Sequence, residues 1–230
     1  MLAAILNGKV SSRADNSEDL LTSVVFGSYE HLPFESGLGA FLRSTKGRAP
    51  LPSELFDSVA AEVRYWPWWK EEDAAPGAEP DVVLWLTDNQ GVRRMVVVEA
   101  KRDSGMSGRG TNDQLARQAK NGLALARRTG ARFVGIVYLT AHFMPPWNEL
   151  ASSQQAMVQH FGLVSAVPLW WASWREQREI LRVASARKAQ GIEEKLARDA
   201  GACLEKWGLE WFRGFSPAPS VPGYHFGRAQ

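Results

Sequence analysis

Two apolar runs joined by a short turn constrain the fold of this chain more than any other feature. Residues 81–87 (DVVLWLT) and 93–100 (RRMVVVEA) flank residues 88–91 (DNQG), which have the composition of a hairpin turn. Short runs rich in valine and leucine are typical of buried β-strands. The sequence therefore predicts two adjacent antiparallel strands.

Charged residues stand at the ends of these runs, although burying a charge is costly unless it is paired or bound to a metal ion. Asp81 begins the first run, and Glu99 and Lys101 end the second. In a hairpin, the start of one strand lies beside the end of the other, so the two carboxylates can converge if they face the same side. Lys101 shares the face of Glu99, because side chains alternate along a strand.

Two neighbouring carboxylates repel each other unless a divalent cation lies between them, and oxygen ligands favour Mg²⁺ or Mn²⁺. Lys101 beside such an ion can orient a water molecule or help to deprotonate it, and can neutralise charge on a phosphate. A simpler interpretation also fits the residues. In it, Asp81 and Lys101 form an ion pair at the edge of the sheet, and Glu99 is exposed.

The surrounding sequence predicts helices and further strands in the order helix, three strands, helix, strand. Helices are predicted from about residue 15 to Gly27 or Tyr29, from Pro52 to about Ala61, over 113–128 up to Gly130, and over 148–161. Strands are predicted at 63–66, where Pro67 indicates an edge, at 132–139, which is suited to a parallel position, and at 167–172. Residues 37–52 are predicted to be a loop, and 174–213 a helical tract broken at Gly191 and Gly201.

The combination of Pro80-Asp81 with Glu99-Ala100-Lys101, 18 positions after the aspartate, resembles the PD-(D/E)XK nuclease superfamily, a restriction-endonuclease-like group. The resemblance covers about residues 17–139. It implies an α/β fold with an αβββαβ core, in which helices flank a mixed β-sheet, followed by a C-terminal helical extension. The corresponding domains are a nuclease-like domain at 1–173, helices at 174–214 packed on that core, and a Pro/Gly-rich tail at 215–230.

The resemblance also implies roles for individual residues. Asp81, Glu99 and the carbonyl group of Ala100 would bind Mg²⁺ or Mn²⁺, and Lys101 would be the catalytic lysine. An acid on the first helix often joins the site in this family, where it would complete the metal shell directly or through a water molecule. Glu18 is the best match, with Asp19 as its rival, and Glu18 is equally well explained as a first-turn acid that stabilises the helix. Gln114 corresponds to a glutamine on the following helix, with Gln118 one turn further along; Gln114 can also be an ordinary surface residue.

The implied activity is metal-dependent hydrolysis of phosphodiester bonds, with DNA as the expected substrate, in prokaryotic restriction, antiviral defence or DNA repair. Expected partners are DNA, a helicase, ATPase or other defence-system subunit, or a second copy of the chain. Two alternatives stay open: a catalytically inactive relative that binds nucleic acid or assembles a complex, and a nuclease that acts on RNA.

Composition sets limits on these functions. The net charge of +2 means that nucleic-acid affinity must come from a local cleft, a dimer or a partner subunit. The single cysteine, Cys203, allows no internal disulfide, so a reducing cytoplasmic location is expected, with Cys203 as an unreactive core or interface thiol. No apolar stretch approaches the length of a membrane span.

Basic and aromatic residues near the motif have two interpretations each. Phosphate binding or a solvated surface explains Arg102, Arg109, Arg117 and Lys120. Stacking on unpaired bases or, more simply, packing explains Trp66, Trp68 and Trp69, and also Trp170, Trp171 and Trp174.

Overall fold

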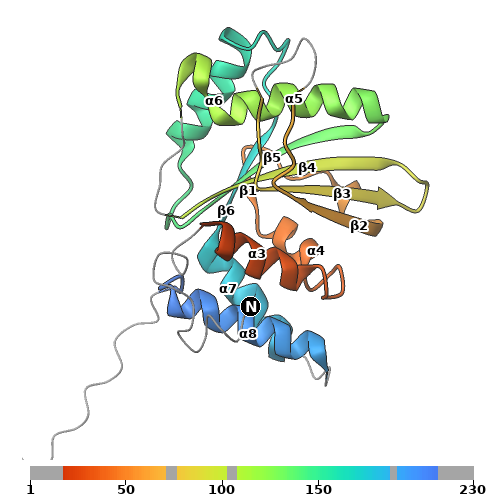
Figure 1. Cartoon of the computed structure of the whole chain (residues 1–230), viewed down its shortest axis with the longest axis vertical. Coiled ribbons are helices and arrows are strands. Elements are labelled where there is room, and N and C mark those ends of the chain that lie inside the picture. The colour runs from red at the N-terminus through yellow and green to blue at the C-terminus, as the bar shows by residue number, and fades with distance from the viewer. Residues whose placement is uncertain (1–17, 71–76, 103–107, 187–190, 212–230) are drawn as a thin grey trace, which may run out of the picture.

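The computed structural model describes residues 18–70, 77–102, 108–186 and 191–211. A six-stranded sheet with the order β1-β6-β5-β4-β3-β2 forms its centre (Figure 1). The strands are β1 (Lys46–Gly47), β2 (Ser58–Tyr65), β3 (Val82–Asp88), β4 (Arg93–Lys101), β5 (Arg132–Thr140) and β6 (Leu169–Ser173). β4, β5 and β6 run parallel, and the other neighbouring strands are antiparallel. The chain is thus an α/β protein with a mixed sheet.

Helices cover both faces of the sheet (Figure 1). On one face lie α3 (Glu18–Tyr29), α4 (Leu38–Arg43), α7 (Trp174–Ala186) and α8 (Ile192–Lys206), and on the other lie α5 (Gln114–Thr129) and α6 (Trp147–Gln159). Two 3₁₀ turns, η1 (Ser53–Leu55) and η2 (Gly110–Asn112), complete the described elements. We call the two faces the α3 face and the α5 face.

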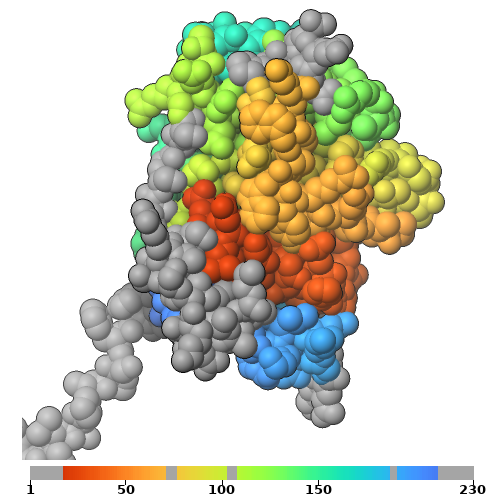
Figure 2. Space-filling view, viewed as in Figure 1, coloured from red at the N-terminus to blue at the C-terminus, as the bar shows by residue number. Residues whose placement is uncertain are grey.

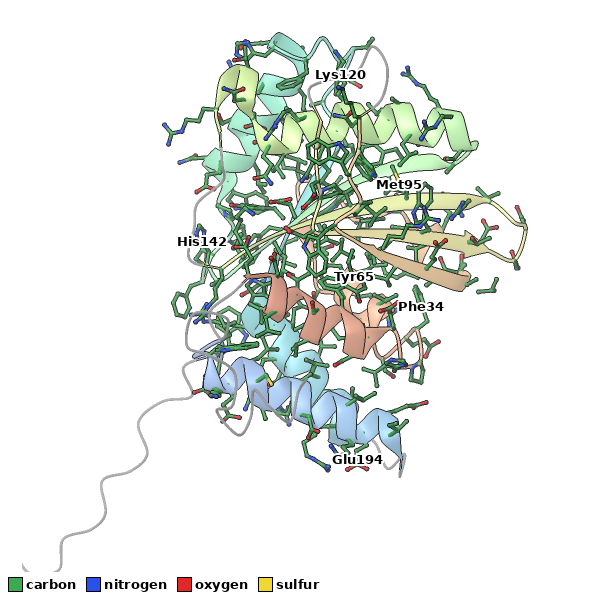
Figure 3. The ribbon with its side chains drawn as sticks, viewed as in Figure 1. Phe34, Tyr65, Met95, Lys120, His142 and Glu194 are labelled. Carbon is green, nitrogen blue, oxygen red and sulfur yellow. The ribbon has the colours of Figure 1, made fainter. Side chains whose placement is uncertain are left out.

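Each face of the sheet has its own hydrophobic core. Along β3, Val82 and Leu84 pack towards the α3 face, whereas Val83 and Trp85 pack towards the α5 face. Figure 3 shows Met95 of β4 on the α5 side and Tyr65 of β2 on the α3 side. Burial on both faces explains why β3 and β4 read as continuous apolar runs.

The predicted hairpin is confirmed, with Thr87 paired to Arg93. Asp88 fixes its turn, because Asp88 Oδ1 accepts hydrogen bonds from the backbone N–H groups of Gln90 and Val92, both at 2.9 Å. Asp88 Oδ2 accepts a third bond, from Arg94 Nη1 at 2.6 Å. Gly91 has φ +79°, a left-handed conformation that glycine adopts without steric cost.

The elements that follow β4 also agree with the sequence. α5 ends at Gly130, which has φ 67° and caps the helix in the left-handed conformation. β5 is parallel to β4 and largely buried, and α6 and β6 lie within one or two residues of their predicted bounds.

Three predictions about elements are wrong. The helix predicted from Pro52 to Ala61 is only the turn η1, after which the chain enters the edge strand β2 at Ser58. The predicted loop at 37–52 contains α4, which buries Phe41 and Leu42, and the short strand β1. Gly201 does not break the last helix. It lies inside α8, where that helix packs against α7.

The C-terminal helices share the core of the α3 face. Cys203 and Leu204 of α8 belong to the same buried cluster as Phe26 of α3 and Val98 of β4. In the view of Figure 2, α8 (blue) lies beneath α3 (red), and the chain segments around β2 (orange) cover the middle of the molecule. Within the described ranges, no helix combines the length and the apolar character that crossing a membrane requires.

Candidate functional site

Asp81 and Glu99 lie opposite each other at one end of the sheet. Val82 pairs with Val98, so the next position along the antiparallel register aligns Asp81 with Glu99. Side chains in such pairs have Cβ atoms roughly 4.5–5.5 Å apart. Both side chains are on the α5 face, because they alternate with Val82 and Val98, which pack on the α3 face.

Both carboxylates are buried. The exposed fraction is 8% for Asp81 and 1% for Glu99. The interpretation in which Glu99 is exposed beside an ion pair of Asp81 and Lys101 is therefore wrong. Glu99 itself pairs with Lys101, whose Nζ lies 2.6 Å from Glu99 Oε1.

The Lys101 ammonium group has three acceptors around it. Besides Glu99, its Nζ donates to Glu18 Oε1 at 2.9 Å and to the carbonyl oxygen of Ala100 at 3.0 Å. Burial alone would lower the pKa of Lys101, but the adjacent carboxylates, Glu99 foremost, outweigh burial and raise that pKa above its ordinary value. Lys101 is therefore a fixed cation, suited to stabilising negative charge and orienting a water molecule rather than to accepting a proton.

Glu18 connects the first described helix to the end of β4. It is the first residue of α3, and its Oε2 accepts a hydrogen bond from the backbone N–H of Arg102 at 2.8 Å. The acid predicted on the first helix thus reaches the motif, while its rival Asp19 is exposed. A first-turn acid also suits the helix dipole, so the two interpretations of Glu18 are compatible.

Two glutamines of α5 hold both oxygen atoms of Glu99. Gln114 Nε2 donates to Glu99 Oε1 at 2.6 Å, and Gln118 Nε2 donates to Glu99 Oε2 at 2.5 Å. The residues are four apart and so lie on one side of the helix. The sequence predicts Gln114 as a site residue and places Gln118 on the same helix face. The spacing of four from Gln114 is the sequence signal for the role of Gln118.

The start of α5 is fixed by its N-cap, Asp113. Asp113 Oδ1 accepts from the backbone N–H of Ala116 at 2.9 Å, and Oδ2 accepts from Ser153 Oγ of α6 at 2.8 Å. This cap orients the first turn of α5, which carries Gln114, with respect to α6 and the sheet.

The electrostatics of the carboxylate pair show a shortage of positive charge. Burial, followed by the charge of Glu99, raises the pKa of Asp81 to about 8, although Asp81 Oδ2 accepts a hydrogen bond from the backbone N–H of Ala100 at 2.7 Å. The pKa of Glu99 is also raised, mainly by burial, against the opposing effects of Lys101 and Gln118. One ammonium group does not fully compensate these buried acids near neutral pH.

Trp66 carries backbone strain beside Asp81. Its φ is 45°, in the left-handed region that bulky residues rarely adopt, at a typical cost of about 1–3 kcal/mol. The Trp66 N–H donates to the carbonyl oxygen of Asp81 at 3.1 Å. The strained residue thus holds the backbone at the start of β3.

Tyr138 is a site neighbour that the sequence did not reveal, because it lies within an apolar run. It is the β5 partner of Glu99 in the parallel register. Its hydroxyl group is buried and has no hydrogen-bond partner within the described part of the chain. Burial, with Glu149 as the next cause, raises the pKa of Tyr138, so the group is a neutral donor that can bind a water molecule or a ligand at the site.

The other predicted candidates divide between surface and core. Arg109 is exposed, whereas Arg102, Arg117 and Lys120 are half-buried. Trp69 is buried in the core of the α5 face, Trp66 is half-buried and Trp68 is exposed. Packing is confirmed for the residues that are fully enclosed, namely Trp170, Trp171, Trp174 and Cys203.

The donor set at this end of the sheet fits a hard divalent cation. Asp81, Glu99 and the Ala100 carbonyl group offer oxygen atoms, as Mg²⁺ and Mn²⁺ prefer, and an added cation would relieve the raised pKa values of the two acids. Among the described residues, no group of three or more His, Cys, Asp or Glu side chains is arranged to hold a metal ion. Glu18 shares the Lys101 ammonium group with Glu99 instead.

No family model, no curated protein and no solved structure matches the chain.

Proposed function

We propose that this protein is a metal-dependent nuclease that hydrolyses phosphodiester bonds, with DNA as the expected substrate. The observation that carries the proposal is the placement of Asp81, Glu99 and Lys101 on one face at one end of the sheet, with both acids buried. A structural ion pair would need one acid for one base. Here there is an extra buried carboxylate whose pKa is raised to about 8, which supports a second cation at this site.

The same placement supports a core of the PD-(D/E)XK type. Apart from α4, the two-residue strand β1 and the 3₁₀ turns, the order α3, β2, β3, β4, α5, β5 is compatible with the αβββαβ arrangement of that superfamily, with Asp81 directly before β3 and Glu99 and Lys101 in the last positions of β4. A role in prokaryotic restriction, antiviral defence or DNA repair follows from the resemblance alone.

The residues have distinct roles in the proposed reaction. Asp81, Glu99 and the Ala100 carbonyl group would hold Mg²⁺ or Mn²⁺, which when bound lowers the pKa of a coordinated water molecule and neutralises charge on a phosphate oxygen. Lys101, kept cationic by its carboxylate neighbours, stabilises the negative charge that develops on the phosphate as the water oxygen bonds to phosphorus and the ester bond breaks. Gln114 and Gln118 keep Glu99 in a single orientation.

The test is cleavage of end-labelled DNA and RNA of one sequence, each single-stranded and double-stranded, with Mg²⁺, Mn²⁺ or a chelator. The proposal predicts cleavage with metal and none with chelator. Asp81→Asn, Glu99→Gln and Lys101→Met should each reduce the rate by at least about 100-fold, because each removes a group that acts on the reacting phosphate.

The matched control is Glu62→Gln, which removes a carboxylate from the exposed edge strand β2, where Glu62 pairs with Arg64 and Arg93. It should cleave at the wild-type rate. Folding of every variant is checked by circular dichroism. Cleavage that survives Glu99→Gln and Lys101→Met in folded protein would contradict the proposed site. Cleavage of RNA without cleavage of DNA would assign RNA as the substrate.

A further inference from the structure

The loop between β5 and α6 exposes a cluster of large apolar side chains. Phe143 is 59% exposed and Met144 is 75% exposed, and Trp147, at the start of α6, is 42% exposed. Single apolar residues on a surface need no explanation, but three exposed within five positions make this segment a candidate interaction site.

The loop is held in place rather than free. Arg175 Nη1 donates to the carbonyl oxygen of Ala141, and Ser173 Oγ donates to the carbonyl oxygen of His142 at 3.3 Å. At the other end, Pro145 and Pro146 restrict the backbone, and the Trp147 N–H donates to the carbonyl oxygen of Pro145 at 2.9 Å. Because the exposed side chains stand on a fixed backbone, little conformational entropy is lost when they bind a partner.

The loop lies at the same end of the sheet as the candidate site. It begins directly after Thr140, which is the register partner of Lys101 in the neighbouring strand, about 4.8 Å away. Figure 3 shows His142 at the end of the sheet where β4 ends and α3 begins. A polymer held at Lys101 therefore passes within reach of this loop.

The chemistry around Phe143 suits a nucleobase. The Arg175 guanidinium carbon lies 3.9 Å from the centroid of the Phe143 ring, and the Trp211 ring centroid is 6.1 Å from it at an interplanar angle of 56°. Aromatic rings combined with arginine bind unpaired bases by stacking and bind the backbone by charge. The Arg175 guanidinium group places a positive charge beside Phe143, which favours a phosphate-bearing polymer over an apolar protein surface.

We propose that Phe143 and Met144 form a stacking surface for unpaired bases, so that the substrate is single-stranded nucleic acid or the unpaired portion of a duplex. This inference rests on the proposed function, because the polymer is placed by the phosphodiester site beside the loop. In a fully paired duplex the bases are stacked on one another and do not offer their faces to Phe143.

The test is a binding titration in the presence of a chelator, so that no cleavage occurs. Fluorescence anisotropy is measured with a labelled 20-nucleotide single strand, the blunt duplex of the same sequence, and that duplex with a single-stranded flap. The wild type should bind the single strand and the flap at least 10-fold more tightly than the blunt duplex. Phe143→Ala should weaken single-strand binding roughly 5- to 100-fold and leave duplex binding unchanged. Phe143→Trp keeps an aromatic ring and should bind the single strand as the wild type does.

Ile192→Ala is the matched control, since Ile192 is an exposed apolar residue at the first position of α8. It should bind as the wild type does. Equal binding by Phe143→Ala and the wild type would overturn the stacking surface, as would wild-type protein that binds no oligonucleotide. Self-association in ultracentrifugation that Phe143→Ala abolishes would assign the loop to a protein interface and also overturn it.

The two proposals fail in different ways. Phe143-dependent binding without metal-dependent cleavage of any substrate would contradict the nuclease and keep the stacking surface. Cleavage that requires Glu99 but is indifferent to Phe143 and to strandedness would keep the nuclease and contradict the stacking surface.

Discussion

At the scale of single residues, Glu99 has the most tightly defined surroundings in the site. Lys101 and two glutamines of α5 contact its oxygen atoms, and Asp81 lies opposite it on the neighbouring strand. This many partners for one side chain restrict it to one rotamer, as a metal ligand or catalytic group requires.

The raised pKa of Asp81 predicts how stability depends on pH. Without divalent cations, folded Asp81 binds a proton up to pH about 8, whereas in the unfolded chain it releases that proton near pH 4. Between these values the folded state binds more protons, so the free energy of unfolding falls as pH rises, by at most about 1.4 kcal/mol per pH unit. Urea unfolding at pH 5, 6, 7 and 8 measures this slope. The slope should be shallower in Asp81→Asn. Identical slopes in the variant and the wild type would contradict a raised pKa of Asp81.

Removing the Lys101 charge should make stability depend on metal. Lys101→Met leaves Glu18 and Glu99 without their shared cation, and losing one partner of a buried ion pair typically costs about 3–5 kcal/mol. Mg²⁺ at millimolar concentration should raise the melting temperature of this variant more than that of the wild type. Lys195→Met, at an exposed pair with Asp199, is the control and should show neither effect. If Lys101→Met were as stable as the wild type and its melting temperature did not respond to Mg²⁺, the role of Lys101 as the shared cation would be contradicted.

Residue patterns reveal only part of such a site. Asp81, Glu99 and Lys101 could be predicted because a hairpin and a period of two determine which side chains share a face. Gln118 and Tyr138 could not be assigned roles, because their partners come from other elements, and no local pattern specifies how α5 and β5 pack against β4.

At the scale of elements, local sequence predicted the hairpin and α5 well and the edge of the sheet poorly. The turn residues of the hairpin and the capping residues of α5 act within a few positions of themselves. By contrast, residues 58–62 contain Ala60, Ala61 and Glu62, which favour a helix in isolation. They form β2 because β3 offers an unpaired edge, a tertiary contact that outweighs local propensity.

The cap of α5 should matter for both stability and the site. Asp113→Ala removes the hydrogen bonds to Ala116 and Ser153 and should lower the free energy of unfolding by about 2 kcal/mol. Amide exchange should accelerate in the first turn of α5, which carries Gln114. Asp113→Asn keeps a capping oxygen, so its free energy of unfolding should fall much less. Equal stability of the Ala and Asn variants would show that the cap does not hold α5.

At the scale of the whole molecule, the two C-terminal helices and the sheet share one hydrophobic core on the α3 face, so we expect them to unfold as one unit. α8 residues such as Leu204 share their buried cluster with Val98 of β4, next to the motif. The helices after the predicted boundary at residue 173 pack on the α3 face of the sheet whose end carries the candidate site. The predicted break at Gly201 failed because a glycine was interpreted as a helix stop, whereas here it lies inside α8.

Gly201→Ala should therefore stabilise the protein. A Cβ atom at this position would lie 3.7 Å from Leu181 Cβ, an ordinary van der Waals contact, and alanine favours the helix by about 0.5–1 kcal/mol. The contrast is Gly135→Ala in β5, where φ is +156° and a Cβ atom would lie within 2.4 Å of the Pro168 carbonyl oxygen, so it should be destabilising. Thermal unfolding should show one transition in both variants. If Gly201→Ala raised the melting temperature of only one of two separate unfolding transitions, the C-terminal helices and the sheet would not unfold together.

The measurement that tests the central claim most directly is Mn²⁺ binding, followed by electron paramagnetic resonance at pH 7.5. Mn²⁺ should bind the wild type saturably, bind Asp81→Asn and Glu99→Gln at least 10-fold more weakly, and bind Glu62→Gln as tightly as the wild type. Equal Mn²⁺ binding by all four proteins, or none by the wild type, would contradict the claim that this end of the sheet holds a catalytic cation.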